Sequence, residues 1–258
     1  MILAVDIGNS NVVVGGAEGG SWPHIWRFPT LTDREAVLFY HKQLSLHFLD
    51  ADIDPVRLEA VVISSVVPDL TAGMEGVLEA LSGKPPIVMG PKIYPYLPLK
   101  IDRPDEIGTD LVANALAAYL NLKKDTIVVD FGTALTFTII DKTGHIRGVN
   151  IAPGLKTAIS ALFNKTAQLP EVPLELPNSI VGQSTVQAIQ NGILVGYIGL
   201  VRHMLSEIRK ELGPQYVAVA TGGLSAILEP LKPDFVLIDP VLTLNGIRLA
   251  AELVNASH

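Results

Sequence analysis

The stretch MILAVDIGNSNVVVGG (residues 1–16) has a counterpart later in the chain, IVVDFGTALTFTIID (residues 127–141). In each stretch an apolar run ends in Asp-x-Gly, small or polar residues follow, and a second β-rich run comes next. When Asp6 is aligned with Asp130, the glycines two residues later also align, and the offset of 124 residues (130 − 6) is close to half of the 258-residue chain. The pattern predicts two hairpins, each opening one of two similar domains.

Strands and helices alternate along both halves of the sequence, which indicates an α/β fold. Further strands are predicted at residues 58–67, 85–90, 216–223 and 235–240. Apolar spacing predicts helices at residues 32–50, 69–81, 110–122, 154–165, 184–213 and 242–254. Thr32, with Glu35 three residues on, is expected to cap the first helix, and the longest is expected to kink near Gly196 and Gly199. The proline-rich segments are predicted to be loops, at residues 90–107 and 167–177.

The composition describes a chain with a large apolar interior, because 48% of the residues are hydrophobic and only 17% are charged. The absence of cysteine excludes disulfides and thiolate metal sites, and it fits a reducing cytosol. The formal charge of −7 comes without a basic block, so nucleic acid and anionic membranes are poor candidates as partners. No apolar run approaches the ~20 residues of a membrane-spanning helix.

The two Asp-x-Gly turns have the composition of a phosphate-binding site. Glycine beside small polar residues exposes backbone N–H groups, and two such turns can cradle a polyphosphate. The turn residues are Gly8, Asn9, Ser10 and Asn11 in the first copy, and Gly132 and Thr133 in the second. A carboxylate beside phosphate requires a cation, so Asp6 and Asp130 indicate a nucleotide with Mg²⁺. Either copy alone is more simply an ordinary strand end, but the two copies together with the pair Gly222-Gly223 favour the nucleotide.

A series of motifs resembles that of the type III pantothenate kinases, in the same order and across nearly the whole chain. The motifs are DIGNSN, ISSVVP, EIGTDLVANALAAY, DFGTALTF, IAPGL, TAQLPEV, GQSTVQAIQNGI, ATGG and LTLNGI. That family belongs to the acetate kinase, sugar kinase, Hsp70 and actin superfamily. The resemblance therefore implies two duplicated ribonuclease-H-like domains facing across a nucleotide cleft, which we place at residues 1–118 and 119–258.

The same resemblance implies an activity. It is the ATP-dependent phosphorylation of pantothenate to 4'-phosphopantothenate, the first step of coenzyme A synthesis. The enzyme is expected to be a cytoplasmic homodimer that requires Mg²⁺ with its ATP and a monovalent cation, K⁺ or NH₄⁺.

The resemblance also implies roles for individual residues. Asp110 is the general base that takes the proton from the pantothenate hydroxyl, although a carboxylate at a helix start is also an ordinary feature. Asp6 acts on the nucleotide through Mg²⁺, and Asp130 binds the monovalent cation. The remaining ATP contacts are assigned to Gly8, Asn9, Ser10, Asn11, Gly132, Thr133, Gly222 and Gly223, and the pantothenate contacts to Gly108, Thr109, Asp110 and Thr185.

Two of these assignments have plain structural alternatives. Gly222 and Gly223 could equally form a simple turn from a strand to a helix. Thr185 could cap the long helix, and that role is compatible with a substrate contact.

The acceptor half of the motif set departs from the family pattern. Leu111 stands where the family has an arginine that helps to hold pantothenate, Ile101 where it has a tyrosine, and Val149 where it has a second glycine. Nearby residues that could replace the missing cation and ring are Lys100, Arg103, Arg147, Tyr94 and Tyr96. Two interpretations stay open: an active pantothenate kinase with a rebuilt acceptor pocket, or an altered member acting as a nucleotide-binding regulatory protein or as a kinase for another small alcohol.

Overall fold

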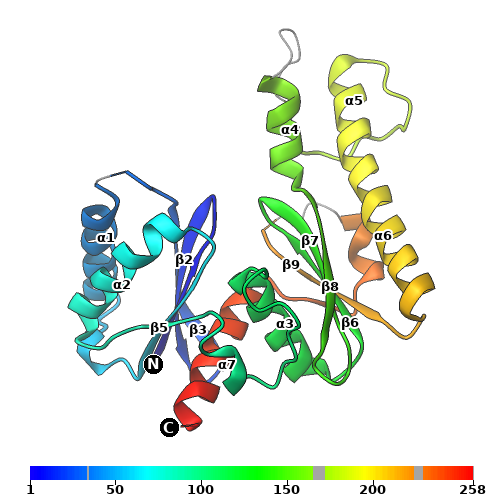
Figure 1. Cartoon of the computed structure of the whole chain (residues 1–258). Coiled ribbons are helices and arrows are strands. Elements are labelled where there is room, and N and C mark those ends of the chain that lie inside the picture. Colours follow the sequence, from blue (N-terminus) through cyan, green and yellow to red (C-terminus); the bar gives the residue numbers. More distant parts are fainter. Residues whose placement is uncertain (34, 165–171, 224–228, 258) are drawn as a thin grey trace. The chain divides into compact units, whose positions relative to one another are not determined.

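The computed structural model describes residues 1–33, 35–164, 172–223 and 229–257 (Figure 1). Its internal contacts define two compact units, the first made of Met1–Asn121 and Leu242–His258 and the second of Leu122–Val241. Each unit contains one five-stranded sheet. The first part of the predicted loop at 167–177 lies outside the described residues, and its remainder, residues 172–177, forms neither helix nor strand.

The sheet of the first unit has the strand order β3-β2-β1-β4-β5. Its strands are β1 (Ile2–Ile7), β2 (Asn11–Glu18), β3 (Ser21–Pro29), β4 (Ala60–Ser65) and β5 (Ile87–Val88). β2 is antiparallel to β1 and β3, whereas β4 is parallel to β1 and β5. The predicted N-terminal hairpin and the predicted buried strand within 58–67 are therefore confirmed.

The sheet of the second unit repeats this topology strand for strand, in the order β8-β7-β6-β9-β10. Its strands are β6 (Thr126–Phe131), β7 (Ala134–Ile140), β8 (Ile146–Pro153), β9 (Val217–Thr221) and β10 (Leu237–Ile238). The first three form an antiparallel meander, and β9 is parallel to β6 and β10. The repeat in the sequence thus corresponds to a repeat in the structure, and the predicted α/β class is confirmed.

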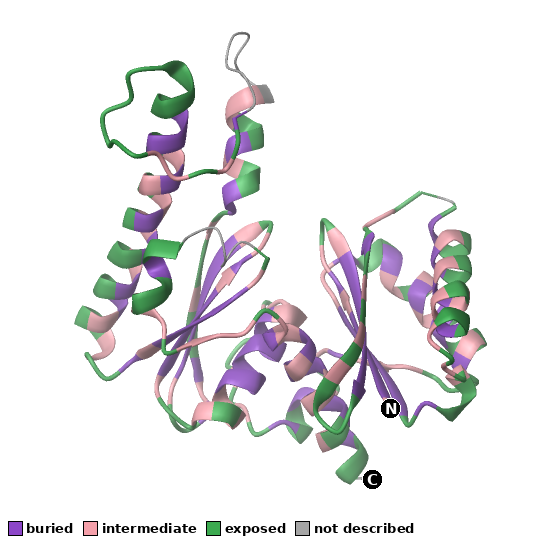
Figure 2. Cartoon of the chain, turned by 180° about the vertical axis from the view of Figure 1, so that it is seen from behind, coloured by how far each residue is buried: buried purple, intermediate pink, exposed green. Residues whose placement is uncertain are grey.

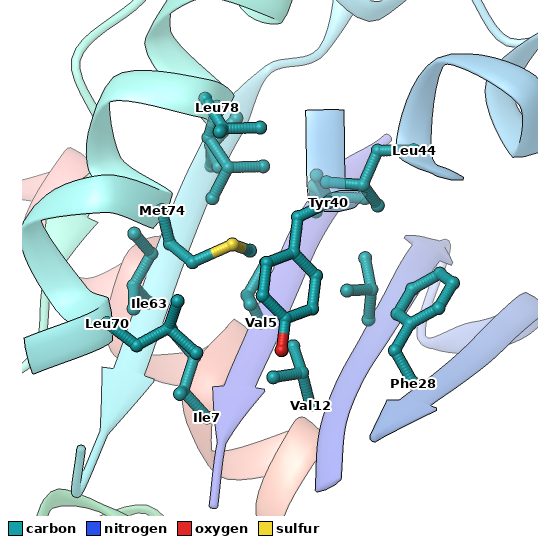
Figure 3. Close-up of a cluster of buried hydrophobic side chains, with 14 of the residues drawn as sticks. Val5, Ile7, Val12, Phe28, Tyr40, Leu44, Ile63, Leu70, Met74 and Leu78 are labelled. Carbon is teal, nitrogen blue, oxygen red and sulfur yellow. The ribbon is translucent and has the colours of Figure 1, made fainter. Parts of the chain in front are cut away.

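The core of the first unit lies between its sheet and two helices, α1 (Ala36–Asp50) and α2 (Pro68–Ser82). Side chains two residues apart in a strand share a face, which is why Leu3, Val5 and Ile7 all join this core. Figure 3 shows Tyr40 of α1 and Met74 of α2 within the same cluster. Because these positions are fully or almost fully buried, they hold both helices against the strands.

The first helix begins later than the sequence predicts. α1 starts at Ala36, its N-cap is Glu35, and no side chain caps it. Instead, the Glu35 N–H donates to Asp33 Oδ1 at 3.0 Å. The predicted capping box of Thr32 and Glu35 is therefore wrong, because an Asp two residues upstream satisfies this amide first.

The second unit packs α4 (Leu155–Asn164) and α6 (Gly196–Leu212) on its sheet. The predicted helix at 184–213 is present as α5 (Thr185–Gln190), a π-helical turn (Asn191–Val195) and α6. The irregular point of the helix is this π turn, which ends directly before Gly196, one of the two glycines near which the kink is predicted. Buried residues recur along one stripe of α6, at Ile198, Val201, Leu205 and Ile208 (Figure 2).

Two helices far apart in the sequence, α3 (Thr109–Leu122) and α7 (Leu242–Ala256), meet in the first unit. α7 contacts β1 and β4, on the side of the sheet opposite α1 and α2 (Figure 1). Thr243 Oγ1 of α7 donates to the buried Asn114 Oδ1 of α3 at 2.9 Å. The compact units therefore differ from the division at 118/119, which placed residues 242–258 in the C-terminal half, because the last helix packs on the first sheet.

Within the described ranges, no helix combines the length and apolarity needed to cross a membrane.

The contact between α3 and α7 depends on a glycine. A Cβ on Gly246 would stand 1.9 Å from the carbonyl oxygen of Ala113, and backbone cannot move aside as a side chain can. We expect Gly246→Ala to lower the free energy of unfolding by about 1–3 kcal/mol, measured by urea denaturation. Gly76→Ala in α2 is the matched control, since its Cβ would meet nothing within 4 Å and should stabilise the helix by about 0.5–1 kcal/mol. Equal effects of the two substitutions would contradict this account.

Candidate active site

The loop between β1 and β2 is held by backbone hydrogen bonds. The Gly8 N–H donates to Asn11 O at 2.9 Å and closes the turn. Thr30, which follows β3, donates from its N–H to Ser10 O at 3.1 Å and from its Oγ1 to Gly8 O at 2.6 Å. Asn9 and Ser10 are exposed at the tip. The conformation of the loop is thus held by hydrogen bonds within the protein itself.

The loop between β6 and β7 is held in the same way. The Gly132 N–H donates to Ala134 O at 3.1 Å, and the Gly154 N–H, following β8, donates to Thr133 O at 3.0 Å. Thr157 Oγ1 adds a bond to that same Thr133 carbonyl at 2.7 Å. A Cβ on Gly154 would stand 2.2 Å from Gly132 O, so only glycine permits this approach.

The residues that brace the loops, Thr30 and Gly154, were not among the predicted site residues. A signal for them exists in the sequence, because each follows a proline that ends the third strand of its repeat, in IAPGL and in FPT. The strand register shows that the two prolines occupy equivalent positions. Pro29 lies opposite Asn11 in the first sheet, and Pro153 lies opposite Ala134 in the second.

The two strand-ending aspartates occupy equivalent positions in the two sheets. Asp6 lies opposite Ser64 of β4 in the parallel register, and Asp130 lies opposite Thr221 of β9. Each carboxylate therefore has a buried hydroxyl-bearing residue beside it on the same face of its sheet. This pairing follows from strand register and could not be read from the linear sequence.

The surroundings of Asp130 are tight and polar. Gly222 has a φ of +90°, and a Cβ there would stand 2.6 Å from Asp130 Oδ1, so the chain requires glycine at this point. Gly223 differs, because a Cβ on it would meet nothing within 4 Å. Thr136 of β7 lies opposite Asp130 on its other side. The Oγ1 atoms of Thr136 and Thr221 are buried and have no hydrogen-bond partner among the described residues.

The predicted base, Asp110, stands in the first turn of α3. Its Oδ1 accepts a hydrogen bond from the Leu111 N–H at 2.9 Å. The side chain is half-buried, and this burial raises the pKa of the Asp110 carboxyl above its ordinary value, against the opposing effect of the Leu111 amide. A Cβ on Gly108 would stand 2.5 Å from Asp110 Oδ1, so the glycine leaves the space that the carboxylate occupies.

Hydroxyl groups connect the start of α3 to the end of β4. Thr109 Oγ1 lies 2.9 Å from Ser64 Oγ and donates to Ser65 O at 3.1 Å. Because Ser64 is the register neighbour of Asp6, these bonds position the helix that carries Asp110 beside the strand that carries Asp6. The structure therefore brings Asp6, Gly108, Thr109 and Asp110 together at the carboxyl edge of the first sheet, where ligands bind in such folds.

A family model identifies the chain. The model for type III pantothenate kinase matches residues 2–207. The chain belongs to the type III pantothenate kinase family. The type III pantothenate kinase of Treponema pallidum (strain Nichols) is 44% identical over 262 residues, covering 99% of this chain and 95% of the relative. That of Syntrophotalea carbinolica is 38% identical over 252 residues, covering 96% and 97%.

Solved structures share the fold at low identity. MreB 5 of Spiroplasma citri, bound to AMPPNP, has a TM-score of 0.57 at 10% identity and covers 99% of this chain and 97% of its own. The activator of 2-hydroxyisocaproyl-CoA dehydratase from Clostridium difficile, with bound ADPNP, has a TM-score of 0.56 at 10% identity and covers 99% and 96%. Together with the two equivalent sheets, these likenesses confirm the predicted α/β fold of two duplicated domains.

Two positions where this chain departs from the family pattern bear on the acceptor half of the site. Leu111, where the family pattern has arginine, is buried with 7% of its surface exposed. Ile101, where the pattern has tyrosine, is half-buried. The candidate replacement cations are already paired with carboxylates: Lys100 with Asp102 at 3.9 Å, Arg103 with Glu106 at 3.1 Å and Arg147 with Asp141 at 3.8 Å.

Thr185, the predicted pantothenate contact in the second unit, is the first residue of α5 and is exposed. The helix is capped by Ser184, whose side chain accepts from the Gln187 N–H. The alternative role of Thr185 as the cap is therefore wrong, because the preceding serine takes it.

The position of the Asp110 carboxylate depends on Gly108. In Gly108→Ala the new Cβ should push the carboxylate aside, and a displacement of about 1 Å from reacting position can lower kcat about a hundredfold. Steady-state kinetics would measure this loss, and the melting temperature should change little because a flexible side chain can move. Gly76→Ala serves again as the control, with kcat unchanged. A Gly108→Ala protein with normal kcat would show that this spacing is not critical.

Proposed function

We propose that this protein phosphorylates pantothenate with ATP, giving 4'-phosphopantothenate and ADP in the first step of coenzyme A synthesis. The observation that carries the proposal is the half-buried Asp110 carboxylate. The hydroxyl of the preceding Thr109 is bonded to Ser64 of β4, the strand parallel to that of Asp6. Membership of the type III pantothenate kinase family supplies the substrate. A base beside a phosphate loop is the arrangement that phosphoryl transfer to an alcohol requires.

In the proposed reaction, Asp110 accepts the proton of the pantothenate hydroxyl as its oxygen attacks the γ-phosphorus. The bond from that phosphorus to the bridging oxygen of ADP breaks, and ADP carries away the electron pair. Backbone N–H groups at the tips of the two loops donate to nucleotide phosphates, apart from those of Gly8 and Gly132, which close their own turns. These donors are already oriented by the bonds from Thr30 and Gly154, so little reorganisation is required when charge develops.

The residues present fit a divalent ion carried by the nucleotide. In the part of the chain that the structure describes, no three His, Cys, Asp or Glu side chains come together as a metal site. A single carboxylate, Asp6, with phosphate oxygens and waters is a usual ligand set for Mg²⁺. When bound, Mg²⁺ neutralises phosphate charge, and Asp6 is the protein residue that would hold or orient it.

The surroundings of Asp130 fit a monovalent cation. Next to this carboxylate lie two threonines, Thr136 and Thr221, whose buried hydroxyl oxygens lack hydrogen-bond partners within the described residues. Oxygen ligands of this kind suit K⁺, and an ion would satisfy polar atoms that are otherwise costly to bury. We assign Asp130 to the monovalent cation, with NH₄⁺ as a substitute.

A second function is favoured by one specific observation. Leu111 is buried and cannot replace the cation that the family pattern has there. An altered family member, either a nucleotide-binding regulatory protein or a kinase for another small alcohol, would need no such cation. The intact Asp6, Asp110, Asp130 and Thr133 favour pantothenate kinase activity.

The homodimer and the cytoplasmic location stay predictions. The dimer is supported by residues of α6 that pack against the core only in part, Tyr197, Leu200 and Met204.

Asp110→Asn tests the base directly. We expect turnover in an ADP-release assay with pantothenate, ATP, Mg²⁺ and K⁺ to be lost, since the amide keeps the shape but cannot take the proton. Burial raises the pKa of Asp110 in the folded state, so its contribution to stability is present at low pH and is lost as pH rises through that pKa. The asparagine variant should therefore melt at the same or a higher temperature at pH 7.

The pH profile of the parent enzyme provides a further check. The acid limb of kcat/KM should lie above the pKa of an ordinary aspartate. A variant that turns over normally would remove Asp110 from the mechanism, and a parent without turnover would favour the second function.

The cation assignment predicts a dependence on the salt in the buffer. Activity should be low with Na⁺ and should return with K⁺ or NH₄⁺, while Asp130→Ala should remove both the dependence and most of the activity. Initial rates in matched ionic strength would measure this, with Asp141→Ala as a control because Asp141 follows the far end of β7 from the loop residues. Equal rates in Na⁺ and K⁺ would contradict the assignment.

A further inference from the structure

Tyr94 lies in the segment that follows β5, at the same edge of the first sheet as the residues around Asp110. It begins a short 3-10 helix (Tyr94–Tyr96), and its N–H donates to Gly90 O at 3.3 Å. β5 is parallel to β4, the strand whose end is bonded to Thr109. The connections after parallel strands meet at their carboxyl ends, so Tyr94 belongs to the ligand-binding edge.

The Tyr94 side chain is buried but its polar atom is unsatisfied. Only 5% of the residue is exposed, and within the described residues its hydroxyl has no hydrogen-bond partner. A buried hydroxyl without a partner is unfavourable, and such groups in native proteins usually meet a ligand or a water. Tyr96, two residues on, is 41% exposed, so the structure separates the two tyrosines that the sequence left as equal candidates.

The electrostatic surroundings of Tyr94 place it near the base. Burial, together with the smaller effects of the Asp110 and Asp105 carboxylates, raises the pKa of Tyr94 to about 12. The phenol is therefore neutral at physiological pH and can donate a hydrogen bond. The two acidic groups give a negative local potential, which disfavours a substrate carboxylate at this point.

The other buried tyrosine of this unit shows what a structural hydroxyl looks like. Tyr40 is fully buried, and its hydroxyl donates to Pro29 O at 2.9 Å and accepts from the Leu31 N–H at 2.9 Å. The protein satisfies this phenol completely with its own backbone. Tyr94 is similarly buried but has no such partner among the described residues, which leaves its hydroxyl able to bind a ligand.

We propose that Tyr94 is a specificity-determining residue whose hydroxyl binds an uncharged polar group of the acceptor, the amide or the hydroxyl that is not phosphorylated, next to Asp110. The proposal rests on the proposed function, because it takes pantothenate as the acceptor. It gives the acceptor pocket an aromatic hydroxyl from the same connection as Ile101, at a position seven residues earlier. The carboxylate of pantothenate is held elsewhere.

Tyr94→Phe removes the hydroxyl and keeps the ring. Loss of one neutral hydrogen bond should raise the pantothenate KM, and its Kd in calorimetry, about 2- to 12-fold. The KM for ATP should stay the same, and the melting temperature should not fall, because the free protein loses an unsatisfied group. Tyr40→Phe is the matched control: it should lower the melting temperature by unpairing two backbone groups and leave the pantothenate KM unchanged.

Pantothenol, which has an alcohol in place of the pantothenate carboxylate, locates the contact within the substrate. Tyr94→Phe should weaken the binding of pantothenol by the same factor as the binding of pantothenate. If Tyr94→Phe weakens the binding of pantothenate but not of pantothenol, the assignment to an uncharged group is overturned. An unchanged pantothenate Kd in Tyr94→Phe would overturn the proposal. So would a lower melting temperature with equal losses of affinity for both substrates, because either result shows that the hydroxyl meets only a structural water.

Failure of the proposed function gives a different result. If the parent binds pantothenate without turnover and Tyr94→Phe weakens binding, the contact stands and the kinase activity does not. If the parent neither binds nor phosphorylates pantothenate, both are wrong.

Discussion

One backbone hydrogen bond in each unit fixes the loop on which the site depends. The Thr30 N–H holds Ser10 in the first unit, and the Gly154 N–H holds Thr133 in the second. Each bond comes from outside the hairpin it braces, so the loop is fixed only when the third strand of the sheet is in place. Because N–H groups that bind phosphate must be left without partners in the protein, such a loop cannot stabilise itself through them. Its conformation is therefore a property of the whole meander.

Much of the fold could be predicted from the sequence, because local patterns carry it. The two hairpins, the buried strand β4 and the alanine-rich α3 follow from alternation and propensity, and their repetition indicates the duplicated sheets. Features that depend on partners far away in the sequence could not be read. α7 packs on the first sheet, and Ser64 and Thr221 lie beside Asp6 and Asp130 through strand register. The π turn before α6 also has no signal in the apolar spacing.

The candidate site shows the same division. Its glycine-rich turns and Asp110 stand in recognisable motifs, whereas the unsatisfied hydroxyl of Tyr94 is visible only from burial. The duplication explains where the units differ. In the first unit, residues 89–108 join β5 to α3, but in the second only residues 239–241 join β10 to α7. Tyr94 and Gly108 lie in the longer connection and Asp110 follows it. These three acceptor features, unlike Thr185 of the second unit, therefore arise at the connection that is longer in the first copy. The phosphate loops, by contrast, lie in the part that both copies share.

The packing of α7 on β1 and β4 has a consequence for how the protein is made. The second unit, Leu122–Val241, is an insertion within the chain of the first. On the ribosome the N-terminal sheet emerges long before α7, and until then this helix cannot cover its face of β1 and β4. The second unit is one continuous stretch of chain, so it is complete as soon as that stretch has been translated. Synthesis thus runs in an order in which the domain begun first is completed last, and a nascent chain must keep its first sheet from misassociating while the inserted domain is translated.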